Sequence, residues 1–284
     1  MDIYSETAQM QQRALTEKRS GRRIAFVPTM GYLHDGHASL LHEARRRGDI
    51  LALSIFVNPA QFGPQEDLST YPRDMDRDLA IAQQAGVDLV WTPTPESVYP
   101  AGYATWVDVE GLTDTLCGAS RPGHFRGVTT VVCKLFNVVQ ADVALFGQKD
   151  FQQLAVIRRM TLDLNLPVEI VGMPIVREAD GLALSSRNVY LSADQRSQAL
   201  CLSRALATAR QMVAAGVADS DAILAAVRSL IEAETDTCID YLQICHQLTL
   251  QDQKRIDTDS VLLLAVLVGK TRLIDNGFLF SQAT

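Results

Sequence analysis

Strand-like and helix-like patterns alternate along the chain from Ile24 to Pro174. Short apolar runs predict strands near residues 24–28, 50–57, 88–91, 141–146 and 168–171. Apolar residues at helical spacing predict helices near residues 36–47, 74–86, 128–139 and 151–164. The run at 50–57 is almost wholly apolar, as in a strand that is covered on both faces. The pattern therefore predicts an α/β fold with a doubly wound, Rossmann-like parallel sheet, to which a short segment at 105–109 is expected to add an edge strand or hairpin arm.

The C-terminal part of the chain has a different pattern. Two alanine-rich helical stretches at 192–215 and 219–234 precede strand-like segments at 239–246, 261–268 and 271–275. Helices followed by neighbouring strands are typical of an α+β unit with an antiparallel sheet. We therefore expect two domains, a Rossmann-like domain over residues 1–175 and a smaller C-terminal α+β domain over residues 176–284.

The composition is that of an ordinary globular protein and argues against several classes of partner. Lys and Arg number 26 against 33 Asp and Glu, so the net charge of -7 argues against a broad nucleic-acid surface. The longest late apolar run, Val261 to Val268, is far too short to cross a bilayer, and the N-terminus lacks the basic and apolar regions of a signal peptide. The five cysteines form no disulfide framework. We expect a cytoplasmic protein without nucleic-acid or membrane partners.

Two histidines and two glycines join the first predicted strand to its helix, in the sequence Pro28-Thr-Met-Gly-Tyr-Leu-His-Asp-Gly-His37. His37 falls in the first helical turn, where unpaired backbone N–H groups and the helix dipole favour an anion, and Gly36 lets a ligand approach the backbone closely. The motif alone fits phosphate binding and an ordinary helix cap equally well. A zinc site is disfavoured because the other histidines and the cysteines have no paired ligand spacing, so no metal site is predicted.

Two later loops also follow predicted strands and carry polar residues. Asn58 and Gln61 lie among apolar residues and can hydrogen-bond a small ligand, although a plain Asn-Pro turn is the simpler explanation of this loop taken alone. Lys149 precedes the helix at 151–164. A cation at a helix N-terminus is unfavourable unless an anion is nearby, which favours phosphate binding over an ordinary surface lysine. Asp150 is suited to cap this helix, and Gln153 lies one turn beyond Lys149.

A polar loop between the two predicted domains carries Ser185, Ser186 and Arg187. Two hydroxyls and a guanidinium match the donors that a polyphosphate needs, but a serine pair before an arginine is also common in linkers. The segment at 120–127 either adds further cations to such a site, Arg126 among them, or forms a mobile surface turn.

The cations of these loops fall where a doubly wound sheet binds its ligand. In an acidic chain, His34, His37, Lys149 and Arg187 on loops that follow strands predict a local positive site for a ligand that carries phosphates. The chain has no Gly-x-x-x-x-Gly-Lys-Ser/Thr motif and no Gly-x-Gly-x-x-Gly after its first strand, which excludes a P-loop ATPase and the usual dinucleotide fingerprint.

In this order the motifs closely resemble those of the pantothenate synthetase family (pantoate-beta-alanine ligases), whose His-x-Gly-His signature is shared with other nucleotidylyltransferases and with class I aminoacyl-tRNA synthetases. The resemblance runs nearly end to end and is carried by Pro28–Gly31, His34–His37, Ser54–Pro59, Arg121–Gly127, Lys149–Gln153, Asp180–Asn188 and Arg272–Asn276. It implies an ATP-dependent ligase: pantoate and MgATP form enzyme-bound pantoyl adenylate and pyrophosphate, and beta-alanine then displaces AMP to give pantothenate. It also implies a catalytic domain over residues 1–175 that binds ATP and pantoate, a lid domain over residues 176–284, and a homodimer.

The resemblance also implies roles for individual residues. The catalytic groups would be His34, His37, Lys149 and Arg187, with acid catalysis usually assigned to His37, and pantoate would be held by Gln61 and Gln153. ATP would be bound by Met30, Gly31, Tyr32, Leu33, His34, Asp35, Gly36, His37, Gly147, Gln148, Lys149, Asp150, Val176, Leu184, Ser185, Ser186 and Arg187. Two positions depart from the family pattern: Gln148 stands where Glu is frequent, and Leu184 stands where some members have Met, a swap of similar volume.

Two other functions fit the same phosphate-binding groups. One is a nucleotidylyltransferase that releases an adenylylated product, and AMP formation that depends on beta-alanine distinguishes it from a ligase. The other is a non-catalytic regulator that binds an adenine nucleotide. The joint presence of His37, Lys149 and the Ser-Ser-Arg loop argues against this regulator.

Overall fold

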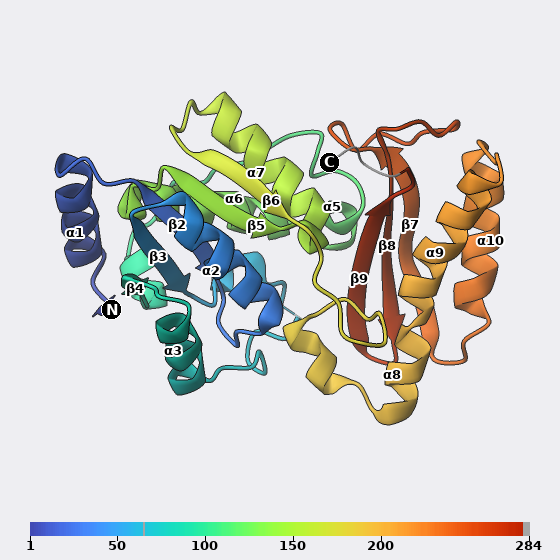
Figure 1. Ribbon diagram of the computed structural model, residues 1–284, viewed down its shortest axis with the longest axis horizontal. Coiled ribbons are helices and arrows are strands. Elements are labelled where there is room, and N and C mark those ends of the chain that lie inside the picture. The colour runs from blue at the N-terminus through green and yellow to red at the C-terminus, as the bar shows by residue number, and fades with distance from the viewer. Residues whose placement is uncertain (65, 281–284) are drawn as a thin grey trace. The chain divides into compact units, whose positions relative to one another are not determined.

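Six short strands form a parallel sheet in the order β1-β4-β3-β2-β5-β6. The computed structural model describes residues 1–64 and 66–280, and its ribbon is drawn in Figure 1. The strands are β1 (Asp2–Tyr4), β2 (Ile24–Thr29), β3 (Ile50–Ile55), β4 (Leu89–Trp91), β5 (Val143–Gly147) and β6 (Glu169–Met173). The order reverses at β2, because β3 and β4 lie on one side of it and β5 and β6 on the other. Doubly wound sheets bind their ligands beyond the carboxyl ends of the strands at such a switch point.

Helices cover both faces of this sheet. The helices in this part of the chain are α1 (Thr7–Arg19), α2 (Asp35–Arg47), α3 (Met75–Gln84), α4 (Pro95–Val98), α6 (His124–Val139) and α7 (Phe151–Asp163). On one face, Ala25 of β2 packs in a cluster with Leu41 of α2 and Ala82 of α3. On the other face, Phe136 of α6 meets Phe146 of β5 edge to face, with 6.3 Å between the ring centroids. The strands are therefore apolar on both sides, as the run at 50–57 predicted.

The chain packs into two units. The first contains Met1–Gly111, Arg121–Gln148 and Val156–Pro174, and the second contains Leu112–Ser120, Lys149–Ala155 and the chain from Ile175 onward. The predicted assignment of residues 1–175 as catalytic domain and residues 176–284 as lid stays a prediction. Within residues 1–64 and 66–280, none of the helices has the length and hydropathy of a bilayer-spanning segment.

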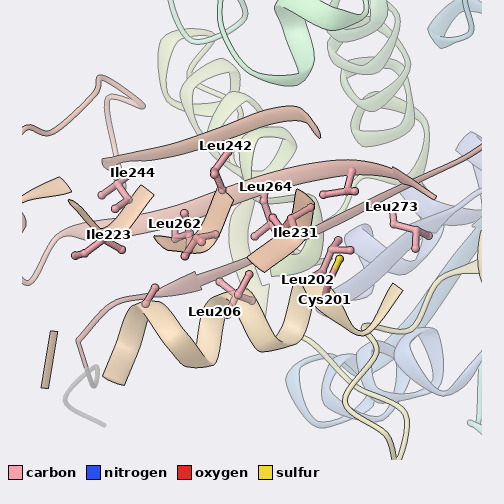
Figure 2. Packing of buried hydrophobic residues seen from close by; sticks show 14 of the residues in the cluster. Cys201, Leu202, Leu206, Ile223, Ile231, Leu242, Ile244, Leu262, Leu264 and Leu273 are labelled. Atoms are coloured by element: carbon pink, nitrogen blue, oxygen red, sulfur yellow. The ribbon is translucent and has the colours of Figure 1, made fainter. Parts of the chain in front are cut away.

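The second unit contains a three-stranded antiparallel sheet in the order β7-β8-β9. Its elements are α5 (Cys117–Ser120), α8 (Ala193–Ala199), α9 (Cys201–Ala214), α10 (Ser220–Glu232), β7 (Thr237–His246), β8 (Ser260–Val268) and β9 (Thr271–Phe278). Figure 2 shows Leu262 of β8 in one cluster with Leu206 of α9 and Ile223 of α10. The next residue, Leu263, belongs to a second cluster with Phe151. β8 is thus apolar along its whole length because both of its faces are covered.

The fold class is the predicted one, but some details differ from prediction. The segment at 105–109 is not a strand, because its backbone bonds side chains of α6: the Val107 N–H donates to Thr130 Oγ1 (3.0 Å), and the Val107 carbonyl accepts from Thr129 Oγ1 (2.5 Å). The helix predicted at 192–215 is two helices, which meet at Leu200. β1 and α1 were not predicted, because β1 has three residues and the Gln- and Arg-rich α1 shows little apolar periodicity.

Candidate active site

The turn after β2 carries the first predicted site residues, Met30 to His37. It is tied to β3, since Thr29 Oγ1 donates to the Ser54 carbonyl (2.8 Å) and accepts from the Gly31 N–H (3.2 Å). Gly31 has a φ of +83°, and a Cβ at this position would lie 2.9 Å from Asp78 Oδ2. The turn therefore requires glycine here on both conformational and steric grounds.

The side chain of Asp78 holds this turn by hydrogen bonds, a role that was not predicted from the sequence. It projects from α3, is 1% exposed, and accepts hydrogen bonds from the backbone N–H groups of Tyr32 (2.7 Å) and Leu33 (2.6 Å). Burial raises the pKa of the Asp78 carboxyl, and the two N–H groups only partly offset that effect. The one sequence signal is an acidic residue four positions before Ala82, on the apolar stripe of its helix.

His34 and His37 form the start of α2. His34 is the N-cap, and its Nδ1 accepts from the Gly36 N–H (3.1 Å), while His37 Nδ1 accepts from the His34 N–H (3.3 Å). The ring centroids are 4.1 Å apart. Because Nδ1 of each ring accepts a hydrogen bond, a neutral ring carries its proton on Nε2. The pair is therefore a helix cap, and the cap fixes which ring nitrogen has a hydrogen to donate.

Gln61 lies in the short 3-10 turn η1 (Pro59–Gln61) that follows β3. Its side chain joins two loops, because Oε1 accepts from Asn58 Nδ2 (3.1 Å) and Nε2 lies 3.2 Å from Met30 Sδ. Asn58 is itself held, since its Oδ1 accepts from the Tyr99 hydroxyl (2.8 Å) and its Nδ2 also donates to the Gly127 carbonyl (3.1 Å). The orientation of the Gln61 amide is thus set by its neighbours.

The backbone of Gln61 is fixed by the Arg-Pro-Gly-His motif. The Gln61 carbonyl accepts from His124 Nδ1 (2.8 Å) and from Arg121 Nη2 (3.3 Å). Arg121 Nη1 lies 3.1 Å from His124 Nε2, and an arginine only donates, so the His124 proton is on Nδ1. Arg121 also forms a two-point pair with Glu66, in which the guanidinium lowers the pKa of Glu66 against the opposing effect of burial. In the first unit, this motif is a support for Gln61.

Two further residues of that motif have clear local roles. A Cβ on Gly127 would lie 2.3 Å from the Ala60 carbonyl oxygen, so only glycine lets α6 approach the turn so closely. Arg126, a candidate phosphate ligand from its motif, lies over the Trp106 ring (4.9 Å to the centroid) and beside Asp108 (3.4 Å).

The remaining predicted residues lie at the end of β5 or in the second unit. Gly147 ends β5, and Gln148, Lys149 and Asp150 form a 3-10 turn before α7. The Lys149 carbonyl accepts from Asn276 Nδ2 (2.9 Å). Gln153 is half-buried in the first turn of α7, directly after the buried Gln152.

The Ser-Ser-Arg loop follows a short hairpin of the second unit. Leu184 N–H donates to the Val176 carbonyl (3.0 Å), which closes the hairpin. Ser185 caps the 3-10 helix η3 (Ser186–Tyr190), and its Oγ accepts from the Arg187 N–H (3.3 Å). The structure thus brings Met30 to His37 together with Gln61 in the first unit, and Val176 together with Leu184 to Arg187 in the second.

Comparison with known proteins gives one consistent result. A family model described as pantoate-beta-alanine ligase matches residues 2–278. The pantothenate synthetase of Syntrophotalea carbinolica is 60% identical over 282 residues, which cover 99% of this chain and 100% of that protein. A crystal structure of pantothenate synthetase from Thermus thermophilus is similar with a TM-score of 0.94 and 47% identity, covering 99% of this chain and 100% of that one. A pantoate-beta-alanine ligase from Francisella tularensis, complexed with beta-gamma ATP and beta-alanine, has a TM-score of 0.81 and 30% identity, with 98% of each chain covered.

Proposed function

This chain belongs to the pantoate-beta-alanine ligase family, and we propose that it joins pantoate to beta-alanine in two steps, through a pantoyl adenylate formed from ATP. The chain is thus an enzyme of pantothenate biosynthesis, of the pantoate-beta-alanine ligase type. The observation that carries the two-step proposal is the pair of histidine rings fixed at the start of α2, which follows the central strand at the switch point of the sheet.

In the first step the pantoate carboxylate attacks the α-phosphorus of ATP. A carboxylate is already ionised and needs no base, so this step requires alignment of the reactants and stabilisation of charge. His34 and His37 donate from Nε2 to phosphate oxygens, and the N-terminal N–H groups of α2 favour the same anion. Lys149 and Arg187 supply positive charge for the phosphates, as in other phosphoryl-transfer enzymes.

The remaining ATP contacts are proposed on the same basis. The turn from Met30 to Gly36 lines the nucleotide, Gly147 to Asp150 meet its ribose and phosphates, and Val176 meets the adenine. Leu184 to Ser186 hold the triphosphate together with Arg187. The half-buried Val176 and Leu184 are joined by a backbone hydrogen bond, which supports their assignment to one ligand.

Gln61 and Gln153 are proposed to hold pantoate and then the pantoyl part of the adenylate. Gln61 supports this role because Oε1 is occupied by Asn58, so that its amide N–H groups are the donors for a hydroxyl or carboxylate. In the second step the beta-alanine ammonium loses a proton and its amine attacks the acyl carbon, with AMP as the leaving group.

Mg²⁺ is proposed to enter with ATP. Mg²⁺ prefers to keep several waters and to bind one or two carboxylates together with substrate phosphates. Among the described residues, no group of three or more His, Cys, Asp or Glu side chains is placed to hold a metal. An ion held mainly by the triphosphate and by water needs few protein ligands, and it would neutralise charge on the phosphates.

We also propose a cytoplasmic homodimer that uses the extended segment at 104–110. The N–H and the carbonyl of Val107 both form hydrogen bonds with α6. In an extended chain, the N–H and carbonyl groups of the two neighbours, Trp106 and Asp108, point to the opposite side. Across residues 1–64 and 66–280, no hydrogen bond engages the backbone of Trp106 or Asp108, and the Trp106 side chain is 40% exposed. That open edge fits the same segment of a second copy. None of the five cysteines, all of which lie in the described residues, forms a disulfide, which fits a reducing compartment.

The test is isotope exchange between pyrophosphate and ATP. The proposed ligase exchanges pyrophosphate into ATP only with pantoate present, and then forms AMP and pantothenate in equal amounts when beta-alanine is added. A nucleotidylyltransferase would release a free adenylylated product without beta-alanine. A regulator would bind ATP in calorimetry without any exchange.

A further inference from the structure

Asn188 follows the Ser-Ser-Arg loop and ties it back to the hairpin that precedes it. Its Nδ2 donates to Glu178 Oε1 (2.7 Å) and to the Ala183 carbonyl (3.1 Å). Its backbone N–H donates to the Ser185 carbonyl (3.0 Å). One side chain therefore contacts both arms of the hairpin, at Glu178 and at Ala183, and holds the residue that follows the loop against them.

Glu178 is itself held by a second contact. Its other carboxylate oxygen, Oε2, accepts from Arg196 Nη2 (2.7 Å), and the same guanidinium nitrogen reaches Asp180 Oδ2 (2.7 Å). The Arg196 hydrogen bond lowers the pKa of Asp180, so this carboxyl stays ionised and keeps Arg196 in place. The two oxygens of Glu178 thus have separate partners, one on each side.

The hairpin that carries Glu178 is anchored to the sheet of the second unit. Arg177 forms a two-point pair with Asp275 of β9, with N–O distances of 2.7 and 2.8 Å, and also donates to the Gly181 carbonyl (3.0 Å). Asp275 is 3% exposed. The hairpin is therefore held in place on the sheet. The hydrogen bond between Glu178 and Asn188 then positions residues 185–187 relative to this hairpin.

We propose that Asn188 and Glu178 are positioning residues that set the backbone of Ser185, Ser186 and Arg187 for the triphosphate before ATP binds. The inference rests on the proposed role of that loop in ATP binding. A loop that is already ordered loses less conformational entropy when the ligand arrives, so the pair acts on ATP affinity. It has no part in binding pantoate.

The first test is Asn188→Asp, which puts a carboxylate against Glu178 Oε1 and the Ala183 carbonyl. We expect KM for ATP to rise by about tenfold or more, as for loss of a hydrogen bond to a charged group, while KM for pantoate stays unchanged. Affinity for a non-hydrolysable ATP analogue, measured by calorimetry, should fall by the same factor. Affinity for AMP, which has no β- or γ-phosphate, should not.

A compensating exchange separates positioning from general damage. In the double variant Glu178→Gln/Asn188→Asp, the Gln Nε2 can donate to the new Asp while the Gln oxygen accepts from Arg196, so much of the lost ATP affinity should return. Val189→Ala is the matched control, because this neighbour in η3 is 59% exposed. If Asn188→Asp does not fold, Asn188→Ala, which removes the same donor without adding charge, takes its place.

The outcomes are distinguishable. If the wild-type enzyme shows no exchange that depends on pantoate, the proposed function itself fails. If the wild type exchanges but Asn188→Asp and Asn188→Ala match Val189→Ala in KM for ATP, the positioning role is wrong. A fall in kcat with unchanged KM for ATP, or an equal loss in the double variant, would also overturn it.

Discussion

Replacing Asp78 with alanine tests whether one buried carboxylate holds the turn that leads to His34. The change leaves the N–H groups of Tyr32 and Leu33 without their acceptor, and each such loss costs about 1–3 kcal/mol. Removal of a buried charge offsets part of this cost, because burial has raised the pKa of Asp78. We expect a net loss of roughly 1–3 kcal/mol in the free energy of unfolding at neutral pH.

The effect on activity should exceed the effect on stability. Displacement of the turn by even 1 Å would misplace the groups proposed to bind phosphate, and errors of that size cost about a hundredfold in rate. The assays are urea denaturation for stability and pantoate-dependent pyrophosphate exchange for the first step. Asp76→Ala is the matched control, because Asp76 lies exposed in the same helix. Equal stability and equal exchange in Asp78→Ala and Asp76→Ala would refute the reasoning.

The pH dependence of the same pair of proteins gives a second check. A carboxyl whose pKa is raised on folding binds its proton more tightly in the native state. Its contribution to stability is then fully present below the unfolded pKa, and is lost as the pH rises through the folded pKa. The difference in unfolding free energy between wild type and Asp78→Ala should therefore narrow from acid pH toward neutrality. A difference that widens over this range would contradict the direction of the shift.

The other predictions concern single contacts. Gly127→Ala should lower the free energy of unfolding by about 1–3 kcal/mol and raise KM for pantoate, because its Cβ would lie 2.3 Å from the Ala60 oxygen. Gly63→Ala is the control and should be tolerated, because the nearest atom to its Cβ would lie 3.7 Å away. Trp106→Ala should shift the protein toward monomer in sedimentation velocity, and an unchanged dimer would move the interface elsewhere. Lys149→Ala should depress pyrophosphate exchange with Lys149→Arg partly retaining it, and equal exchange in all three proteins would remove Lys149 from the first step. Chelation of Mg²⁺ should abolish exchange and added Mg²⁺ restore it, with the melting temperature of the nucleotide-free enzyme unchanged.

The fold was predictable because the burial of one or both faces of an element determines which of its positions are apolar. The run at 261–268 is wholly apolar, and the run at 50–57 is apolar except for Ser54, because both faces of β8 and of β3 are covered. The helical spacing of apolar residues beyond Gly36 also predicted a helix that begins beside His34 and His37, as α2 does. The segment at 105–109 has the alternation of a strand, yet in this chain Val107 bonds hydroxyl groups of α6, a partner that the segment's own sequence does not reveal.

The contacts that shape the candidate site were less predictable, because they join residues far apart in the sequence. Asp78 meets Tyr32 across 46 positions, and His124 meets the Gln61 carbonyl across 63. From its own segment, His124 is only one of several polar residues in a loop. Its role depends on Gly127, whose missing side chain lets α6 approach the turn at Ala60.

The hydrogen bonds at the start of α2 limit what its histidines can do as acids. Nδ1 of His34 and Nδ1 of His37 each accept from the backbone, so a neutral ring has a single hydrogen, on Nε2. If that hydrogen left with pyrophosphate, the ring would become an imidazolate, a much stronger base than any phosphate oxygen. If instead the ring first gained a second proton on Nδ1, it would lose its bond to the backbone and the helix would lose its cap. A neutral pair is therefore suited to the role proposed for it, in which both rings donate hydrogen bonds to the departing pyrophosphate and keep their hydrogens. In that role pyrophosphate would leave as an anion, and the two rings would be unchanged for the next ATP.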